Sequence, residues 1–199
     1  LQEWAGYLLL PDTGEQAFLI LEGEGANGKS VFCAGIEAIL GPTNCSHVQL
    51  ELFGDRFSKT MTLGKLVNIC GDVGEIDNVA EGTIKALTAG NMMMFDRKTM
   101  SGIEAVPTAR LMIACNNLPR FRDRSQGIWR RAMISPWRIA IPRHERIKNM
   151  DKAEWWEATG ERSGMFKWAL LGLARLRQQG GFTDSVVMDQ AKEEYQLDS

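Results

Sequence analysis

The chain has 199 residues, 44% of them hydrophobic, and a formal net charge of −2. This is enough to bury one core, and no Gly/Ser-rich stretch marks a linker, so we expect a single domain. The nearly neutral balance excludes a general attraction to nucleic acid, so any such binding must come from local basic patches. No apolar run is long enough for a membrane span, and no signal peptide opens the chain, which favours a soluble cytoplasmic protein without a membrane partner. The four cysteines lack paired C-x-x-C spacing, which argues against a metal or redox site.

The first part of the chain predicts helices around a buried strand. Residues 1–10 predict a short amphipathic helix. Residues 17–21 form an apolar run suited to a buried parallel strand, and residues 31–40 predict the helix that follows it. Residues 47–62 are less regular and predict a short strand and a helix.

The most informative stretch lies between that strand and that helix. It reads Gly23-Glu24-Gly25-Ala26-Asn27-Gly28-Lys29-Ser30 and fits G-x-x-x-x-G-K-[ST], the phosphate-binding loop of nucleotide-binding proteins. Its glycines let main-chain N–H groups surround phosphates, Lys29 neutralises the β- and γ-phosphates, and the Ser30 hydroxyl can ligate Mg²⁺. We therefore predict a nucleoside triphosphate and Mg²⁺ site. Its predicted nucleotide-binding residues are Gly23, Gly25, Ala26, Asn27, Gly28, Lys29, Ser30 and Val31.

The next elements add candidate catalytic acids. Residues 65–70 predict a second buried strand that runs directly into Asp72. An acid at the end of a strand, after a phosphate-binding loop, is typical of a carboxylate that holds the water shell of Mg²⁺. Glu75, three residues further on, could orient the attacking water. Residues 78–89 predict a helix.

A hairpin and a third strand follow. Residues 92–106 predict a hairpin with Arg97 and Lys98 at its tip, where exposed bases suit contact with a phosphate backbone. Residues 110–115 predict a strand that delivers Asn116 to its carboxyl end. Ligands of open parallel sheets bind at that edge, so Asn116 could contact the γ-phosphate or the attacking water.

The last part of the chain opens with a concentration of positive charge. The arginines concerned are Arg120, Arg122, Arg124, Arg130 and Arg131. An arginine presented to a neighbouring subunit's nucleotide can accelerate hydrolysis by about 10³–10⁵-fold. Beyond this segment, residues 132–139 predict another strand, and residues 163–179 and 185–197 predict helices that cover the core.

Four motifs in this order resemble the superfamily 3 helicases, in particular the phage- and plasmid-type primase–helicase ATPase domain related to the poxvirus enzyme. The motifs are residues 25–30, 84–90, 114–119 and 123–131. The resemblance implies an α/β fold, a P-loop NTPase of AAA+-like type, with a mostly parallel sheet, flanking helices and a β-hairpin insertion. It also implies that residues 1–199 are a fragment of a larger primase–helicase of a phage, plasmid or mobile element, acting in a bacterial host cell.

The resemblance further implies a ring of identical subunits, usually a hexamer, with ATP between subunits and single-stranded DNA through the centre. It assigns the metal-holding acid to Asp72, the sensor to Asn116, the arginine finger to Arg131 with Arg130 as its companion, and DNA-side roles to Lys85 and Lys98. Two other interpretations remain open. One is a P-loop kinase of a nucleotide or small metabolite, and the other is a DNA-binding assembly module that uses ATP as a switch.

Overall fold

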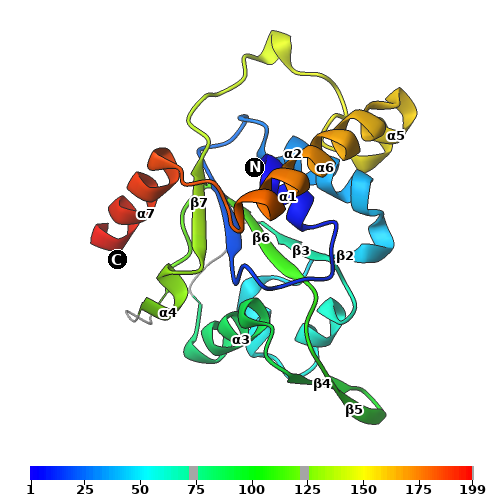
Figure 1. The fold of residues 1–199 in the computed structure, drawn as a ribbon, viewed down its shortest axis with the longest axis vertical. Helices are drawn as coiled ribbons and strands as arrows, with labels where there is room; N and C mark the ends of the chain where they lie inside the picture. The colour runs from blue at the N-terminus through cyan, green and yellow to red at the C-terminus, as the bar shows by residue number, and fades with distance from the viewer. Residues whose placement is uncertain (72–75, 122–125, 199) are drawn as a thin grey trace.

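A parallel sheet forms the centre of the fold. The computed structural model describes residues 1–71, 76–121 and 126–198. Across the sheet the strand order is β2 (Cys45–Ser46), β3 (Val67–Cys70), β6 (Arg110–Cys115), β1 (Phe18–Glu22) and β7 (Ala132–Pro136). Each strand is parallel to its neighbours, so the carboxyl ends of all five meet at one edge (Figure 1). That edge is where open parallel sheets place their ligands.

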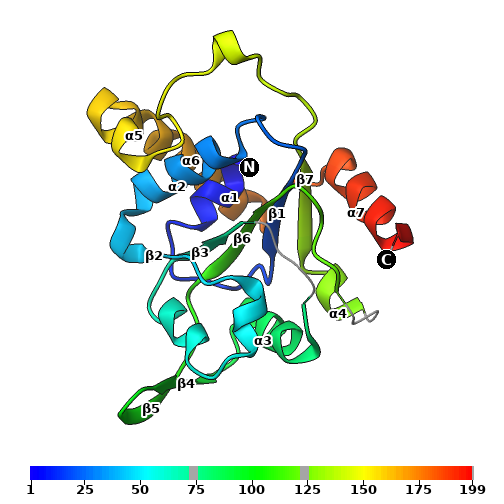
Figure 2. The same cartoon turned by 180° about the vertical axis from the view of Figure 1, so that it is seen from behind.

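Helices cover both faces of the sheet, because the strands carry apolar side chains on both sides. In β1, Leu19 and Leu21 join one buried core, and Phe18 and Ile20 join the other. The helices over the first core are α1 (Gln2–Tyr7), α2 (Lys29–Leu40), α5 (Ala153–Thr159) and α6 (Glu161–Gln179). Those over the second are α3 (Asn78–Ala89), α4 (Gln126–Trp129) and α7 (Val186–Asp198). Figures 1 and 2 show these two groups on opposite sides of the sheet.

Helices α1 and α6 cross at very short distance, because glycine lies on both sides of the crossing. A Cβ on Gly6 would lie 2.4 Å from the backbone nitrogen of Leu173, and one on Gly172 would lie 2.1 Å from the carbonyl oxygen of Gln2. Glu3 strengthens the junction, since its carboxylate accepts hydrogen bonds from Arg175 and Thr183. The first residues of the chain are thus fixed to the last long helices.

The predicted hairpin is confirmed. Strands β4 (Met93–Arg97) and β5 (Met100–Ala105) pair antiparallel and project from the sheet at the bottom of Figure 1. The ring of Phe95 is fully buried, and Met93 at the base of the hairpin packs against the second core. Thr99 in the turn has a positive φ of 61°. Because this turn joins the outer ends of β4 and β5, Arg97 and Lys98 lie at the end of a projecting arm.

The prediction for residues 47–62 is wrong for the strand and correct only in part for the helix. The short strand, β2, comes earlier, and the segment after it contains the 3₁₀ helices η2 (Leu50–Gly54) and η3 (Ser58–Thr62). Asn68 of the neighbouring strand explains this difference. Its side chain bonds both the N–H and the carbonyl oxygen of Val48 at 2.8 Å, so these groups are satisfied by an amide rather than by strand pairing.

Other bounds shift by a few residues, and some short helices were not predicted. Helix α1 ends at Tyr7 instead of residue 10, and β7 ends at Pro136 instead of residue 139. Helix α5 was missed, as was the 3₁₀ helix η4 (Arg143–Glu145). The remaining predicted strands and helices are present.

Candidate functional site

The glycine-rich loop, residues 23–28, connects β1 to α2 at the carboxyl edge of the sheet. Gly25 and Gly28 have φ values of 106° and 93°, and Ala26 has a φ of 52°. Glycine adopts such backbone angles without the steric cost that other residues incur. Gly28 caps α2, so the helix begins at Lys29. Its first N–H groups have no partner within the helix and suit an anion.

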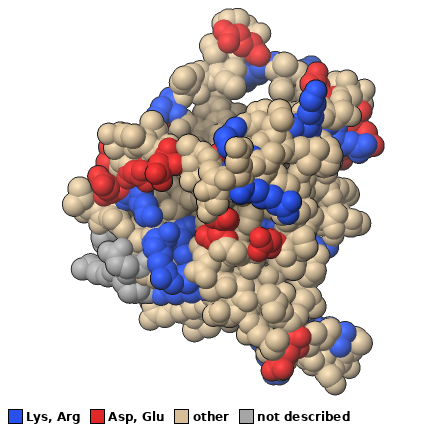
Figure 3. All heavy atoms as spheres, viewed as in Figure 1, with Lys and Arg blue, Asp and Glu red and all other residues tan. Residues whose placement is uncertain are grey.

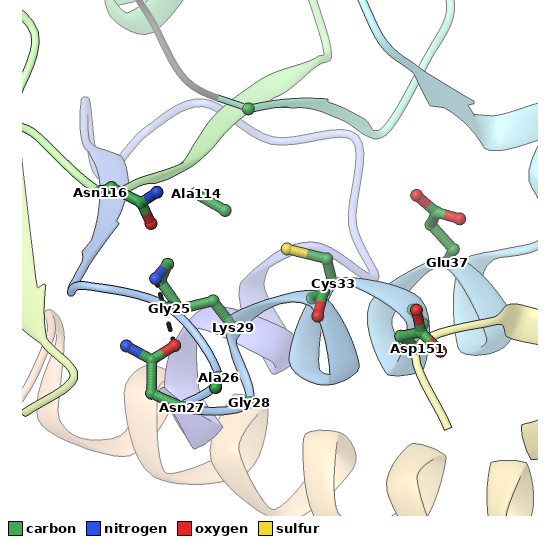
Figure 4. Close-up of a pocket in the computed structure, with 13 residues that line it drawn as sticks. Gly25, Ala26, Asn27, Gly28, Lys29, Cys33, Glu37, Ala114, Asn116 and Asp151 are labelled. Carbon is green, nitrogen blue, oxygen red and sulfur yellow. Dashed lines mark hydrogen bonds between the residues drawn. The ribbon is translucent and has the colours of Figure 1, made fainter. Parts of the chain in front are cut away.

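Lys29 is held by the loop that precedes it. Its ammonium donates one hydrogen bond of 2.6 Å to the carbonyl oxygen of Gly23 and another of 3.1 Å to Oδ1 of Asn27. Only 7% of the Lys29 surface is exposed. Figure 4 shows the aliphatic stem of Lys29 running from α2 toward the centre of the site.

A cavity of about 450 Å³ opens beside Lys29, a size typical of small-molecule sites. Its lining comes from the glycine-rich loop, the first turns of α2, the ends of β3 and β6, and Asp151. Of the eight predicted nucleotide-binding residues, those in the lining are Gly25, Ala26, Asn27, Gly28, Lys29 and Ser30. The other two lie outside the lining: the Gly23 carbonyl oxygen accepts a hydrogen bond from Lys29, and Val31 is half-buried.

The ends of two neighbouring strands complete the site. Asn116 directly follows β6, and its amide points toward the same space as Lys29 (Figure 4). Gly71 follows β3 and also lines the cavity. The predicted acids Asp72 and Glu75 lie outside the described residues, so their roles stay predictions. The structure thus brings together Lys29, Ser30 and Asn116.

One wall of the cavity was not predicted. Cys33 and Glu37 lie four and eight residues after Lys29 on the same face of α2. Burial, together with the charge of Glu37, raises the pKa of the Cys33 thiol to about 12. Oε1 of Glu37 also lies 3.6 Å from Nε2 of His47. The helical spacing could have indicated Cys33 and Glu37, whereas Asp151 comes from a distant segment without any pattern to reveal it.

The residues after β7 lie against the glycine-rich loop, and we call residues 137–141 the strap. The backbone N–H of Trp137 donates to the carbonyl oxygen of Glu22 at 2.6 Å, and that of Ile141 donates to Ala26 at 2.7 Å. Asn27 donates from Nδ2 to the carbonyl oxygen of Trp137 at 2.9 Å. The strap therefore holds the loop at Ala26 and Asn27 and the end of β1 at Glu22.

The two adjacent arginines differ in exposure. Arg131 is 8% exposed, and its Nη1 donates to the carbonyl oxygen of Gly127. Burial lowers the pKa of Arg131, and the charge of Arg130 lowers it further. Arg131 precedes β7 at its amino end, opposite the glycine-rich loop. Arg130 is exposed, as is Arg120, whereas Arg122 and Arg124 lie outside the described residues.

Arg130 lines a smaller cavity of about 200 Å³ together with Lys192 of α7. Figure 3 shows Lys and Arg side chains gathered on this face between α7 and α4.

The candidate DNA-contacting residues fall on two elements. Lys98 lies exposed in the hairpin turn, with its ammonium 5.8 Å from the centre of the Phe57 ring. Arg97 directs Nε and Nη2 to the carbonyl oxygen of Ser101 within the hairpin. Lys85 lies half-buried on α3.

In the described part of the chain, no helix is both long and apolar enough to span a bilayer.

Comparison with known proteins yields viral and structural matches. The chain is 25% identical over 147 residues to a protein of Acanthamoeba polyphaga mimivirus, and 22% identical over 144 residues to one of Invertebrate iridescent virus 3. Both are named "putative helicase". The matches cover 69% and 66% of this chain but 15% of each relative.

The fold is similar to the apo structure of the C-terminal region of NrS-1, with a TM-score of 0.67 and 13% identity. This likeness covers 98% of the chain and 45% of that structure. A second apo structure of the NrS-1 region, residues 305–718 of that protein, has a TM-score of 0.63 and 15% identity over 85% of the chain and 40% of its own length. Together the matches confirm the resemblance to phage and viral helicase domains of the superfamily 3 type. The model of DUF5906, described as a family of unknown function, matches residues 21–131, more than half of the chain, and the chain therefore belongs to this family.

Proposed function

We propose that this chain is the ATPase domain of a DNA helicase, a P-loop NTPase of AAA+-like type. It hydrolyses ATP at the interface between identical subunits, most simply in a hexameric ring, and uses the reaction to move along single-stranded DNA. The main observation behind this proposal is that Lys29, Ser30 and Asn116 line one cavity at the carboxyl edge of the sheet. The naming of two viral relatives as helicases supports the choice among ATPases.

The residues at the cavity suit a triphosphate. Lys29 brings a positive charge that the β- and γ-phosphates require, and the N-terminus of α2 adds backbone N–H donors. Asn116 can donate a hydrogen bond to the γ-phosphate or accept one from the attacking water. The catalytic task is mainly positioning and charge stabilisation, which these groups can perform without covalent chemistry.

Magnesium fits the same residues. The Ser30 hydroxyl is exposed at the cavity, and Asp72 follows Gly71, whose backbone lines it. Oxygen ligands from one hydroxyl, one carboxylate, water and phosphates are the set that Mg²⁺ prefers. Bound there, the metal would neutralise charge on the β- and γ-phosphates. Glu75 is proposed to orient the attacking water.

The arginines suggest how subunits share the site. Arg130 and Arg131 precede β7 at the amino end of the sheet, so neither faces the cavity of its own chain. Arg130 is exposed and can reach a neighbour's nucleotide. We therefore assign the arginine finger to Arg130, and a supporting role to the buried Arg131.

The hairpin supplies the proposed contact with DNA. Lys98 is exposed at the end of the projecting arm, where it can meet a phosphate of a strand passing through a ring. Arg97 shapes the turn through Ser101 and adds positive charge. Lys85 on α3 is a further candidate.

The chain spans 15% of the length of its viral relatives. A primase region is therefore proposed only as another part of a longer protein.

The test measures ATP hydrolysis and unwinding of a forked DNA duplex by the wild-type chain and by Lys29→Ala. We expect Lys29→Ala to abolish both, because the main cation for the phosphates is removed. Lys65→Ala is the matched control, since Lys65 also donates to a backbone carbonyl, that of Thr43, but lies before β3 at the amino end of the sheet. It should keep full activity.

Two other outcomes would favour the alternatives. Transfer of phosphate to a nucleotide or metabolite, without any effect of DNA, would indicate a kinase. Nucleotide-dependent assembly and DNA binding with negligible turnover would indicate a switch module.

A further inference from the structure

Asn27 is buried beside Lys29, and its side chain forms bonds in two directions. Its Oδ1 accepts a hydrogen bond from the Lys29 ammonium at 3.1 Å, and its Nδ2 donates one of 2.9 Å to the carbonyl oxygen of Trp137. Both Asn27 and Lys29 are more than nine-tenths buried. The amide therefore connects the lysine to the strap.

The strap fixes the orientation of this amide. Trp137 bonds the backbone of Glu22 just before the loop and Ile141 bonds that of Ala26 within it, so the Trp137 carbonyl has a defined place. An amide carries its donor and its acceptor on separate branches, so donation to Trp137 turns the oxygen toward Lys29. The junction is tight, because a Cβ on Gly23 would lie 2.2 Å from the Trp137 oxygen and 2.4 Å from Nδ2 of Asn27.

The Lys29 ammonium keeps capacity for a ligand. An ammonium has three hydrogens, and two of them go to the Gly23 carbonyl oxygen and to Asn27. The third hydrogen and the positive charge remain for a ligand in the cavity that Lys29 lines. A long side chain that is already restrained loses less conformational entropy when the ligand binds.

We infer that Asn27 is a positioning residue, which holds the Lys29 ammonium where it meets the β- and γ-phosphates of a bound triphosphate. It acts through Lys29 and touches no reacting atom. This inference rests on the proposed function, because it requires a triphosphate at Lys29.

A double-mutant cycle tests whether Asn27 acts through Lys29. The affinity for a non-hydrolysable ATP analogue is measured for the wild type, Asn27→Ala, Lys29→Ala and the double variant. We expect Asn27→Ala to weaken binding about tenfold in the wild type, the scale of one hydrogen bond to a charged group. In the Lys29→Ala background the same change should cost less than about twofold. An equal loss in both backgrounds would show that Asn27 acts on the loop instead, and would overturn the inference.

A second measurement needs no nucleotide. Acetylation of lysines by an amine-reactive reagent, followed by mass spectrometry, reports how well Lys29 is protected. Asn27→Ala should raise the rate at Lys29 severalfold, because one of its two acceptors is lost. An unchanged rate would overturn the inference.

Asn44→Ala is the matched control for both measurements. Asn44 also donates its Nδ2 to a backbone carbonyl, that of Leu40 at 2.8 Å, but it lies beyond the far end of α2. It should change neither the affinity nor the Lys29 rate. The two possible failures remain separate. If the wild-type chain does not bind the ATP analogue, the proposed function fails. If the wild-type chain binds it but Asn27→Ala leaves the acetylation rate of Lys29 unchanged, only the positioning role of Asn27 fails.

Discussion

Arg130 and Arg131 are adjacent in the chain, yet Arg130 is exposed whereas Arg131 is buried against the carbonyl oxygen of Gly127. The resemblance to the helicase family implies Arg131 as the arginine finger. In this chain Arg130 is the exposed one of the pair, and we propose it as the finger instead. The two residues therefore separate into a proposed catalytic group and a structural one.

Their substitutions should have different effects. Arg130→Ala should lower ATP turnover by about 10³-fold or more while leaving ATP affinity and the melting temperature unchanged. Arg131→Ala removes a buried guanidinium and should lower the melting temperature by several degrees. Turnover, calorimetric ATP binding and thermal unfolding of both variants decide this. A fully active Arg130→Ala would exclude it as the finger.

Lys98 should contribute to DNA affinity through its charge. Lys98→Ala should weaken binding of single-stranded DNA and reduce the slope of log affinity against log salt by about 1, because one phosphate contact is lost. Basal ATP turnover should not change. Fluorescence anisotropy over a salt series provides the measurement. Lys152→Ala is the control, since Lys152 is exposed beside α5 at the other end of the molecule (Figure 1). If Lys98→Ala and Lys152→Ala had the same slope of log affinity against log salt, Lys98 would not contact a DNA phosphate.

Glu3 should make the stability of the chain depend on acid. Burial raises the pKa of this carboxyl, but hydrogen bonds from Thr183 and Arg175 outweigh burial and hold the pKa at about 2. Because the folded pKa lies below the unfolded value of 4.5, the stabilisation is fully present above about pH 4.5 and disappears as the pH falls toward 2.

The full contribution is about 3 kcal/mol. Glu3→Gln should therefore lose most of that stability at pH 7, and its unfolding free energy should vary less between pH 4.5 and 2. Urea unfolding over this pH range checks both expectations. Glu154→Gln, at an exposed position on α5, should behave like the wild type. A Glu3→Gln variant as stable as the wild type at pH 7 would contradict the assignment.

The crossing of α1 and α6 should not tolerate a methyl group. Gly172→Ala should destabilise the chain by about 1–3 kcal/mol, because its Cβ would lie 2.1 Å from the Gln2 oxygen. Gly164→Ala on the same helix is the control, since the nearest atom to its Cβ would be Glu161 Oε2 at 3.8 Å. There, alanine should stabilise the helix by up to about 1 kcal/mol. Equal effects in chemical unfolding would show that the crossing relaxes.

Much of the fold follows from local patterns. The buried strands were predictable because short apolar runs lie between turn residues, as in β1 and β6. The hairpin was predictable from its alternation and its polar tip. The strand prediction after residue 47 failed because Asn68, a residue distant in sequence, bonds the Val48 backbone. Such a contact leaves no periodic signal.

The candidate site was predictable to a similar extent. The motif identified Lys29 and Ser30 because phosphate binding requires those residue types at fixed spacing. Asn116 was predictable because the end of a parallel strand lies at the ligand-binding edge. Asp151 and the strap could not be predicted, since they arrive through tertiary contacts of residues 137–152. The sequence also could not show that Arg130 is exposed and Arg131 is buried. That difference depends on the packing of Arg131 between α4 and β7.

A mixing experiment tests most directly whether two subunits share each ATP site. Lys29→Ala and Arg130→Ala are each expected to be inactive alone, the first in its own cavity and the second toward its neighbour. Mixed in equal amounts and allowed to reassemble, they should regain roughly a quarter of the wild-type ATP turnover, because random assembly restores intact pairs of Lys29 and Arg130 at about that fraction of interfaces. A mixture that stays inactive, although each variant assembles like the wild type, would contradict a site shared between subunits.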